Sequence, residues 1–522
     1  MATTTSLRVR RSAAQLHALA GVEREIRAND PNGRRKYLRD YVEAFPSYQS
    51  VIDREQVGSL VRDADVVWIG DYHALPASQQ FAAALFEERA HLGERKVVLG
   101  VEAIFSRDQH ILDEWWRREI DEAELRRRIR FDLDWGYDWA PFYQVLLAAR
   151  EHGDAVYALD CMPREDLRKI AARDRHAAHK LAEIRERHPG AAILVLFGES
   201  HLAPGHLPRR LKEQMPQERV LTVLQNVDAL YWRAAGERQG VEAVRVADDV
   251  ICVFNATPLE KCEAYRLCLT RWRQEEAEGP DLCPTIYNLL DGLMRFLGIK
   301  LYSTHNTTQP KFLVDTLPEV DGEATEARLQ QVLSRLGWTE AEMTPWLRRL
   351  EERGSVYLPE INVLFVREFQ MMYAAEEAAR FLHRGCQGLP PRGSKKAPAD
   401  TPDGFYRRTV EHALGYVGSR VLYPARPSLN GCDCSRAACE RYAEQASRAD
   451  SAAAEAFAEQ LGYALGTALY ESYLCGNTTR ATLRKLFLWH SKEANAAKET
   501  CFTLSTIGRS GRAKARAAGQ GN

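Results

Sequence analysis

The first half of the chain alternates short, continuous runs of apolar, β-prone residues with longer segments in which apolar residues recur at helical spacing. Short continuous apolar runs are typical of strands buried on both faces of a parallel sheet, and the longer segments are typical of helices that cover those faces. We therefore predict an α/β domain of three layers with a mostly parallel sheet. The predicted strands are Asp65–Gly70, Lys96–Val101, Ala155–Leu159, Ala192–Phe197 and Val220–Leu224, and the intervening helices are Ser78–His91, Asp108–Ile129, Pro141–His152, Arg164–Arg187 and Gly205–Gln214.

The second half of the sequence has a different pattern. From about Glu260 onward long helical periodicities dominate, and after Ser355–Leu358 no further strand is predicted. We therefore expect a largely α-helical C-terminal region after the α/β domain. The predicted helices include Gly322–Leu336, Thr339–Arg353, Leu364–Arg384, Tyr406–Leu422, Ser451–Cys475 and Thr478–His490.

The length of the chain, 522 residues, predicts more than one domain, because single hydrophobic cores stop growing at roughly 250–300 residues. The expected organisation is a helical N-terminal extension (1–55), the α/β domain (56–255), a helical extension (256–384), a linker rich in Gly, Pro and Lys (385–405), a helical region (406–507) and a disordered basic tail (508–522).

Charge and hydropathy exclude several classes of function. The 71 basic and 72 acidic residues give a formal net charge of −1, so electrostatics offers no argument for a nucleic acid or an anionic membrane as partner. No apolar run approaches the roughly 18–20 residues of a membrane span, and the N-terminus lacks the apolar core of a secretory signal. We therefore expect a soluble, unexported protein that resides in the cytoplasm.

A tetrapeptide of the form Gly-acid-x-His occurs twice, each time directly after a predicted buried strand. The first is Gly70–His73 (GDYH), and the second is Gly198–His201 (GESH). Because parallel strands carry their carboxyl ends to one edge of a sheet, we expect His73 and His201 to lie near each other although they are far apart in the sequence.

A third predicted strand ends in Glu102, which places a carboxylate at the same edge. Two imidazoles and one carboxylate suit a divalent-metal site, or a general acid–base pair with an orienting group. The motif acids Asp71 and Glu199 would then accept hydrogen bonds from the imidazoles or complete the ligand set. Tyr72 is a further candidate, since a tyrosinate can ligate ferric haem and a phenol can donate to an oxyanion.

These motifs carry a resemblance to a known family. GDYH, Glu102 within GVEAIF, and the later GESHLAPGHLP resemble the ChaN-like, haem-binding-uptake branch of the superfamily that includes the Tiki and TraB proteins and, more distantly, the erythromycin esterases. The aromatic segment WGYDWAP and the Arg173–Asp174 pair also match the family's pattern in order along the chain. The resemblance spans roughly Asp65 to Leu224, and Asp71 stands where the family usually has Glu.

The resemblance implies several functions for the site. It implies binding of haem or iron, or of a divalent metal such as Mn, Co or Zn held by His73, Glu102 and His201. It also implies hydrolysis of a small-molecule or peptide substrate, in which Glu102 acts as base or ligand and Arg173 stabilises charge. The alternative is a non-catalytic scaffold that docks a partner through its helical region.

Overall fold

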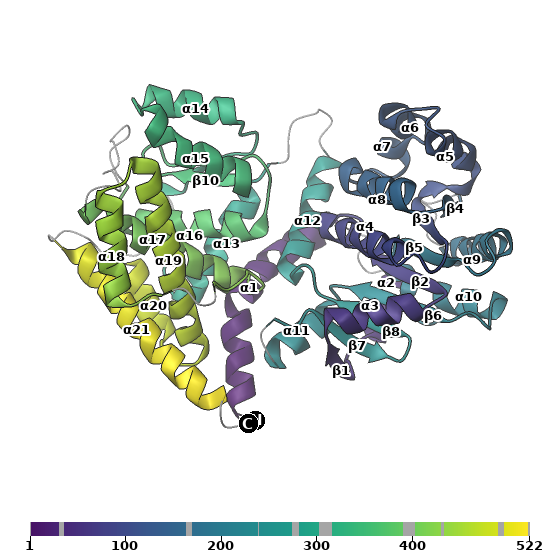
Figure 1. The fold of residues 1–522 in the computed structure, drawn as a ribbon, viewed down its shortest axis with the longest axis horizontal. Helices are drawn as coiled ribbons and strands as arrows, with labels where there is room; N and C mark the ends of the chain where they lie inside the picture. The colour runs from purple at the N-terminus through teal and green to yellow at the C-terminus, as the bar shows by residue number, and fades with distance from the viewer. Residues whose placement is uncertain are drawn as a thin grey trace. The chain divides into compact units, whose positions relative to one another are not determined.

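The computed structural model describes the backbone of residues 2–30, 36–162, 170–237, 240–273, 281–301, 316–389, 402–429, 433–488 and 495–519. The chain divides into two compact units, Glu25–Arg273 on the one hand and Met1–Arg24 with Gln274–Asn522 on the other (Figure 1). Most of the predicted linker, residues 390–401, lies outside the described residues.

In the described part of the Glu25–Arg273 unit, eight strands form one sheet in the order β1-β7-β8-β6-β2-β5-β3-β4. The strands β8, β6, β2, β5, β3 and β4 pair in parallel, and β7 is antiparallel to both β1 and β8. Their bounds are β1 Ser50–Ile52, β2 Val66–Asp71, β3 Val97–Phe105, β4 Ala155–Asp160, β5 Ala192–Gly198, β6 Val220–Gln225, β7 Ala243–Ala247 and β8 Val250–Val253.

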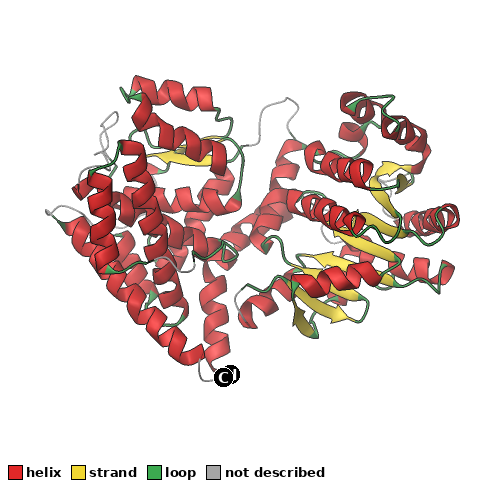
Figure 2. Ribbon diagram, in the orientation of Figure 1, coloured by secondary structure: helices red, strands yellow, loops and turns green. Residues whose placement is uncertain are grey.

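Helices cover both faces of this sheet (Figure 2), which confirms the predicted three-layer α/β domain. Along β2, Val67 and Ile69 pack into one core, and Val66 and Trp68 into the other, as the alternation of side chains along a strand requires. The first core is covered by α3 Arg54–Asp63, α4 Pro76–His91, α5 Gln109–Trp116, α6 Glu122–Arg128, α7 Phe131–Asp134 and α8 Trp139–His152. The second is covered by α2 Lys36–Ala44, α9 Ile170–Arg187, α10 Leu207–Gln214 and α11 Asp228–Glu237.

Two features of this unit differ from the predictions. The strands β1, β7 and β8 were not predicted, because they are only three to five residues long and carry little periodic signal. The single helix predicted over Asp108–Ile129 is two helices, α5 and α6. The break follows from Arg118, whose backbone is left-handed (φ 62°), and from Asp121, whose side chain caps α6.

The second unit is largely helical, as predicted. It contains part of α1 Ala2–Asn29 and the helices α13 Cys283–Leu297, α14 Glu326–Arg335, α15 Glu340–Arg353, α16 Met371–Gln387, α17 Pro402–Leu422, α18 Arg436–Ser447, α19 Ser451–Leu474, α20 Arg480–Phe487 and α21 Ala496–Gly519. A small sheet has the order β10-β11-β9, with β9 Glu319–Asp321, β10 Ser355–Leu358 and β11 Val363–Val366.

The prediction of an uninterrupted helical pattern after Leu358 was wrong at one place. Residues 363–366 form β11, which pairs antiparallel with β10, and the helix predicted from Leu364 begins only at Met371. Four consecutive apolar residues fit a strand as well as a helix, and pairing with β10 decides between them. At the C-terminus, the last described helix is α21, Ala496–Gly519.

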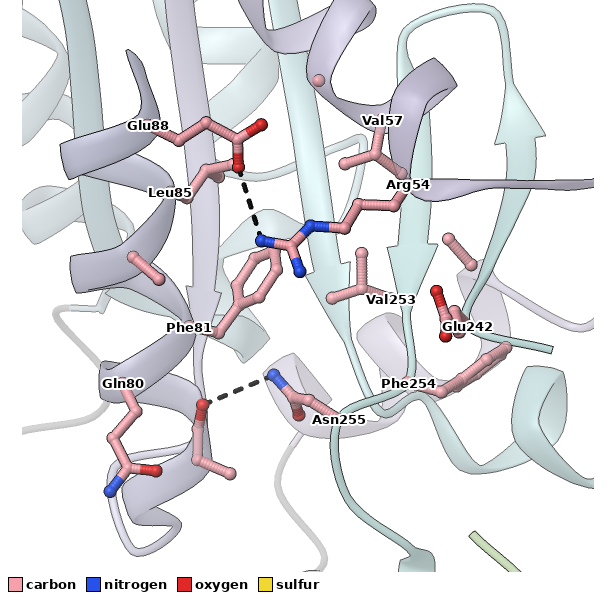
Figure 3. Close-up of a pocket in the computed structure, with 14 residues that line it drawn as sticks. Arg54, Val57, Gln80, Phe81, Leu85, Glu88, Glu242, Val253, Phe254 and Asn255 are labelled. Carbon is pink, nitrogen blue, oxygen red and sulfur yellow. Dashed lines mark hydrogen bonds and ion pairs between the residues drawn. The ribbon is translucent and has the colours of Figure 1, made fainter. Parts of the chain in front are cut away.

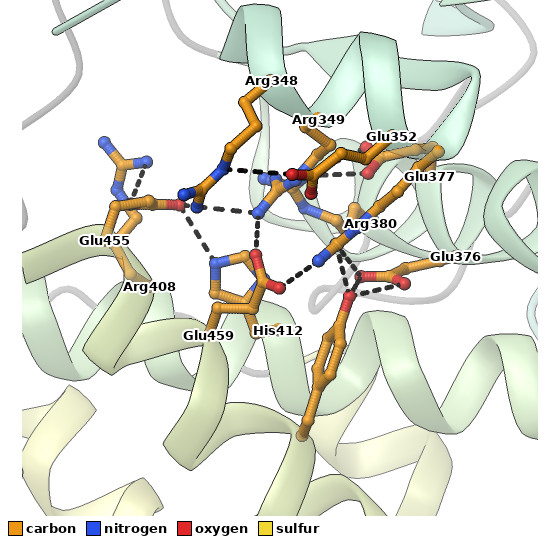
Figure 4. Close-up of polar contacts among 12 residues, drawn as sticks. Arg348, Arg349, Glu352, Glu376, Glu377, Arg380, Arg408, His412, Glu455 and Glu459 are labelled. Atoms are coloured by element: carbon orange, nitrogen blue, oxygen red, sulfur yellow. Dashed lines mark hydrogen bonds and ion pairs between the residues drawn. The ribbon is translucent and has the colours of Figure 1, made fainter. Parts of the chain in front are cut away.

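The interior of the second unit holds a network of buried ion pairs (Figure 4). Arg349 and Arg353 both contact Glu459, and Arg349 donates to it at 2.6 Å. Glu376 is paired with Arg426 at 2.8 Å and is 1% exposed. Such a network ties α15, α16 and α19 together through charges that must remain paired, because an unpaired buried charge is costly.

In the described part of the chain, no helix has both the length and the apolar character that a membrane crossing requires.

Candidate functional site

The two Gly-acid-x-His motifs lie beside each other because β2 and β5 are adjacent parallel strands. Asp71 at the end of β2 is paired in register with Gly198 at the end of β5. On the other side of β5, Val101 of β3 is paired with Leu196, so Glu102 follows one position further along. The carboxyl ends of β2 and β5 thus bring both motifs to one edge of the sheet, beside Glu102, which lies three residues before the end of β3.

Glu102 lies between the two motif histidines. The Nε2 atom of His73 is 3.9 Å from Oε2 of Glu102, and Nε2 of His201 is 3.7 Å from Oε1. The side chains of Glu102 and His201 are each only 4% exposed, whereas that of His73 is 21% exposed. The cluster therefore has a buried end at His201 and an open end at His73.

Each histidine is oriented by a carboxylate on its other ring nitrogen. Nδ1 of His73 lies 2.7 Å from Asp71, and Nδ1 of His201 lies 2.5 Å from Asp174. The two acids are themselves held, Asp71 by the amide of Gln79 and Asp174 by the hydroxyl of Tyr37. Because Nδ1 of each ring contacts its own carboxylate, both rings present Nε2 toward Glu102.

Glu102 itself is fixed as a carboxylate. Arg173 donates to Oε1 at 2.6 Å and to Asp160 at 2.7 Å, and the backbone N–H of Gly198 donates to Oε2 at 2.5 Å. Burial raises the pKa of Glu102, but the two imidazoles and the guanidinium lower it more, so that the net pKa is about 2. Arg173 is 5% exposed and lies behind Glu102, which makes it a residue that positions the carboxylate.

The close approach of the two motifs requires glycine at position 198. A Cβ atom added there would lie 2.9 Å from Oε2 of Glu102 and 3.1 Å from Nε2 of His73. The imidazole of His73 and the carboxylate of Glu102 are therefore packed closely against the backbone of Gly198.

Two of the predicted cofactor contacts form a separate cluster. Glu199 accepts hydrogen bonds from Lys261 at 2.9 and 3.0 Å, and the hydroxyl of Tyr41 lies 3.5 Å away. The ammonium of Lys261 also lies 4.6 Å from the ring centre of Tyr72. Burial lowers the pKa of Lys261, but Glu199 raises it more, so that the net pKa lies above its usual value. Asp71, in contrast, contacts His73 directly.

Aromatic rings surround the open end of the site. The ring of His73 lies 4.4 Å from that of Trp135 and 5.2 Å from that of Tyr137. Tyr137 in turn contacts Trp272, whose ring is also in contact with that of Tyr265. Tyr265 completes the series with an edge contact to Tyr72. We call this set the aromatic rim; it consists of Tyr72, Trp135, Tyr137, Tyr265 and Trp272.

The geometry does not favour the predicted divalent-metal site. Among the described residues, no group of three or more His, Cys, Asp or Glu is arranged so that it could hold a metal ion. The physical reason lies at Glu102, whose two oxygens already accept from Arg173 and from the N–H of Gly198. A dication would also meet the positive charge of the guanidinium.

Several contacts of the site were not predicted from the sequence. Asp160 ends β4, so the same strand-end rule that identified Glu102 could have identified it. Tyr37 and Lys261 come from α2 and from α12 (Pro258–Arg271), outside the sheet, and no motif marks them. Tyr265 lies on α12 and Trp272 directly follows it, so no motif marks these two rim residues either.

Comparison with known proteins shows a similarity to one described family over part of this unit. Residues 59–192 match the sequence model of the family described as "Haem-binding uptake, Tiki superfamily, ChaN". A search of curated proteins gives no match. Among solved structures, the chain is similar to the one described as "Cofacial heme binding to ChaN of Campylobacter jejuni", with 13% identity and a TM-score of 0.27, over 35% of this chain and 93% of that chain.

Proposed function

We propose that this chain binds haem against the aromatic rim at the open end of the site. The premise is that residues 59–192 form a domain of the ChaN family in the Tiki superfamily. The observation that carries the proposal is the position of His73. This imidazole is part exposed, it is oriented by Asp71, and it adjoins the rings of Trp135 and Tyr137.

The chemistry of the rim fits a porphyrin. Aromatic side chains pack well against a large flat ring system and gain from the apolar area that is removed from water. Haem iron takes an imidazole or a phenolate as ligand, and the part-exposed His73 and Tyr72, which follow β2, would supply those groups. The inner space beside Gly198 is too small for a porphyrin, so haem belongs on the rim and not between the two imidazoles.

Titration of the full chain with haemin tests this proposal. We expect a saturable Soret band at one haemin per chain. His73→Ala should weaken binding at least tenfold if the imidazole is the ligand, because loss of an axial ligand removes the main directional contact to iron. Tyr72→Phe should have that effect if the phenolate is the ligand.

The matched control is His110→Ala, which removes an exposed histidine of the same unit. It should bind haemin as the wild type does. Absence of a saturable Soret band in the wild-type protein, or equal affinity of the His73→Ala, Tyr72→Phe and control variants, contradicts the proposal.

A second function is favoured by one specific observation, the convergence of two oriented imidazoles on Glu102. Each histidine with its carboxylate resembles the base and its orienting acid in a hydrolytic centre. We infer that such a centre would use His73 to take a proton from water, that the carboxylate of Glu102 would stabilise the imidazolium that forms, and that His201 would hold Glu102 from its other side. Arg173 acts through Glu102, which it positions.

Hydrolysis is tested with small ester and peptide substrates, with and without added Mn²⁺, Co²⁺ or Zn²⁺. Turnover that is lost in both His73→Ala and His201→Ala, and kept in His110→Ala, supports it. No turnover above the His201→Ala background excludes it and leaves haem binding or a scaffold role.

A further inference from the structure

A second concave site lies in the same unit, between α3, α4 and the strands β7 and β8 (Figure 3). It has a volume of about 530 Å³, within the range of small-molecule sites in proteins. Its floor is formed by Val57, Leu85 and Val253, which are buried in the core beneath it. None of its lining residues belongs to the cluster around Glu102, so this groove is separate from the proposed haem site.

The walls of the groove are aromatic. Phe81 of α4 and Phe254, just after β8, are both part buried and both line it. Figure 3 shows the two rings on different walls, one from the helix and one from the strand end. An occupant with a flat or aliphatic body would cover apolar surface on the floor and on both walls, which is the main source of affinity in such sites.

The inner end of the groove is held in place by hydrogen bonds. The amide of Asn255 donates to Gln225 at 2.7 Å and to the carbonyl of Ala77 at 3.4 Å. Gln225 in turn donates to the carbonyl of Gly70 at 2.7 Å, at the end of β2. These contacts fix the strand end and the first turn of α4, so that the groove exists before a ligand arrives.

The charge of the groove selects the kind of ligand. Its ionisable residues are Arg54, Glu88 and Glu242, which together carry one net negative charge. Arg54 is directed at Glu88 across 3.8 Å. The carboxylate of Glu242 makes no ion pair within the part of the chain that the structure describes, and it borders the groove beside Phe254. A ligand with a cationic group therefore finds the carboxylate of Glu242, which none of the described residues neutralises, and aromatic faces, which attract cations.

We propose that this groove binds a small organic amine, with its apolar body between Phe81 and Phe254 and its ammonium group at Glu242. A carboxylate ligand is disfavoured by the net charge, since Arg54 already has an acidic partner. A neutral ligand of the same shape would gain the apolar contacts alone.

Calorimetric titration of the full chain with three probes of one shape tests the proposal. The probes are phenethylamine, phenethyl alcohol and hydrocinnamate, which are cationic, neutral and anionic. We expect phenethylamine to bind tightest. Glu242→Gln should weaken its binding about two- to fivefold, the effect of one solvent-exposed ion pair, and should leave binding of the alcohol unchanged.

Ala84→Phe provides a second variant, because Ala84 is exposed on α4 and lines the groove. The larger side chain fills the site without disturbing the core, and we expect binding of all three probes to fall roughly tenfold or more. Glu94→Gln, an exposed acid outside the groove, is the control. Equal binding of the amine and the anion, or undiminished binding in Ala84→Phe, overturns the proposal.

Discussion

Glu102 shows how a buried carboxylate can be both charged and stable. Its oxygens accept hydrogen bonds from Arg173 and from the backbone of Gly198, and the imidazoles of His73 and His201 lie within 4 Å. Each of these contacts favours the ionised form, which offsets the desolvation that burial imposes. The same contacts occupy the oxygens, so the residue is better suited to orient and stabilise neighbouring charge than to ligate a metal.

The tight contact at Gly198 leads to the first prediction. Gly198→Ala places a methyl group 2.9–3.1 Å from Glu102 and His73, and one of them must move. We expect the free energy of unfolding to fall by about 1–3 kcal/mol, a typical effect of overpacking. Chemical denaturation measures it. The matched variant is Gly205→Ala, where a Cβ meets no atom within 4 Å; an equal loss in both variants contradicts the predicted crowding.

Arg173 leads to the second prediction. Arg173→Met leaves Glu102 and Asp160 buried without their shared cation, so the protein should lose about 3–5 kcal/mol of stability. Arg173→Lys should retain part of it, because an ammonium restores the charge but cannot reproduce the forked contacts of a guanidinium. The denaturant midpoints of the two variants measure this difference in stability. If the Met variant is as stable as the Lys variant, the charge of Arg173 does not have the predicted role.

At the scale of elements, helices outside the stretch matched to the family complete the site. The helix α2 supplies Tyr37, which donates to Asp174 behind His201, and α12 supplies Lys261, which pairs with Glu199. Neither helix lies within residues 59–192. The orientation of the second motif therefore depends on segments on both sides of the matched stretch.

The pair Lys261–Glu199 gives a prediction at this scale. Lys261→Met leaves the buried Glu199 unpaired and should cost about 3–5 kcal/mol. Adding Glu199→Gln removes the orphaned charge and should recover part of that loss. A double-mutant cycle measures the coupling; additive losses would show that the two side chains do not interact.

The parts of the fold that the sequence predicted are those that have a local sequence pattern of their own. The strands β2, β3 and β5 are continuous apolar runs followed by polar motifs, so both their existence and their common edge were predictable. Helix α12 was not, because no local pattern reveals which helix returns to a strand end. The metal prediction rested on the types of residue at one edge of the sheet. It could not take account of the hydrogen-bond donors to Glu102, because only tertiary packing determines which groups these are.

At the scale of the whole molecule, the helical unit has its own source of stability, the buried ion pairs around Glu376. Burial raises the pKa of Glu376, but Arg426, Arg353 and Arg349 lower it more, to about 2. In the unfolded chain the group titrates near its usual value, which is higher. The pairing therefore stabilises the fold fully above about pH 4.5 and is lost as the pH falls toward 2.

This linkage predicts the response to acid. The unfolding free energy of the wild-type protein should decrease between about pH 4.5 and 2, and Glu376→Gln should flatten that decrease while lowering stability at neutral pH by about 3–5 kcal/mol. Denaturation of the full chain at several pH values, followed by circular dichroism, gives both quantities. An unchanged pH slope in the variant would assign the acid sensitivity to other carboxylates.

The aromatic rim as the haem-binding surface is tested most directly by quenching of tryptophan fluorescence during haemin titration of the full chain. Trp135 and Trp272 belong to the rim, so bound haem should quench them, and the quenching should saturate at one haemin per chain. Replacing both Tyr137 and Trp272 by Leu should weaken the binding at least tenfold, whereas Glu102→Gln, in the inner site, should leave saturation intact. Quenching that rises without saturation, or that is unchanged when the rim is replaced, would contradict the account.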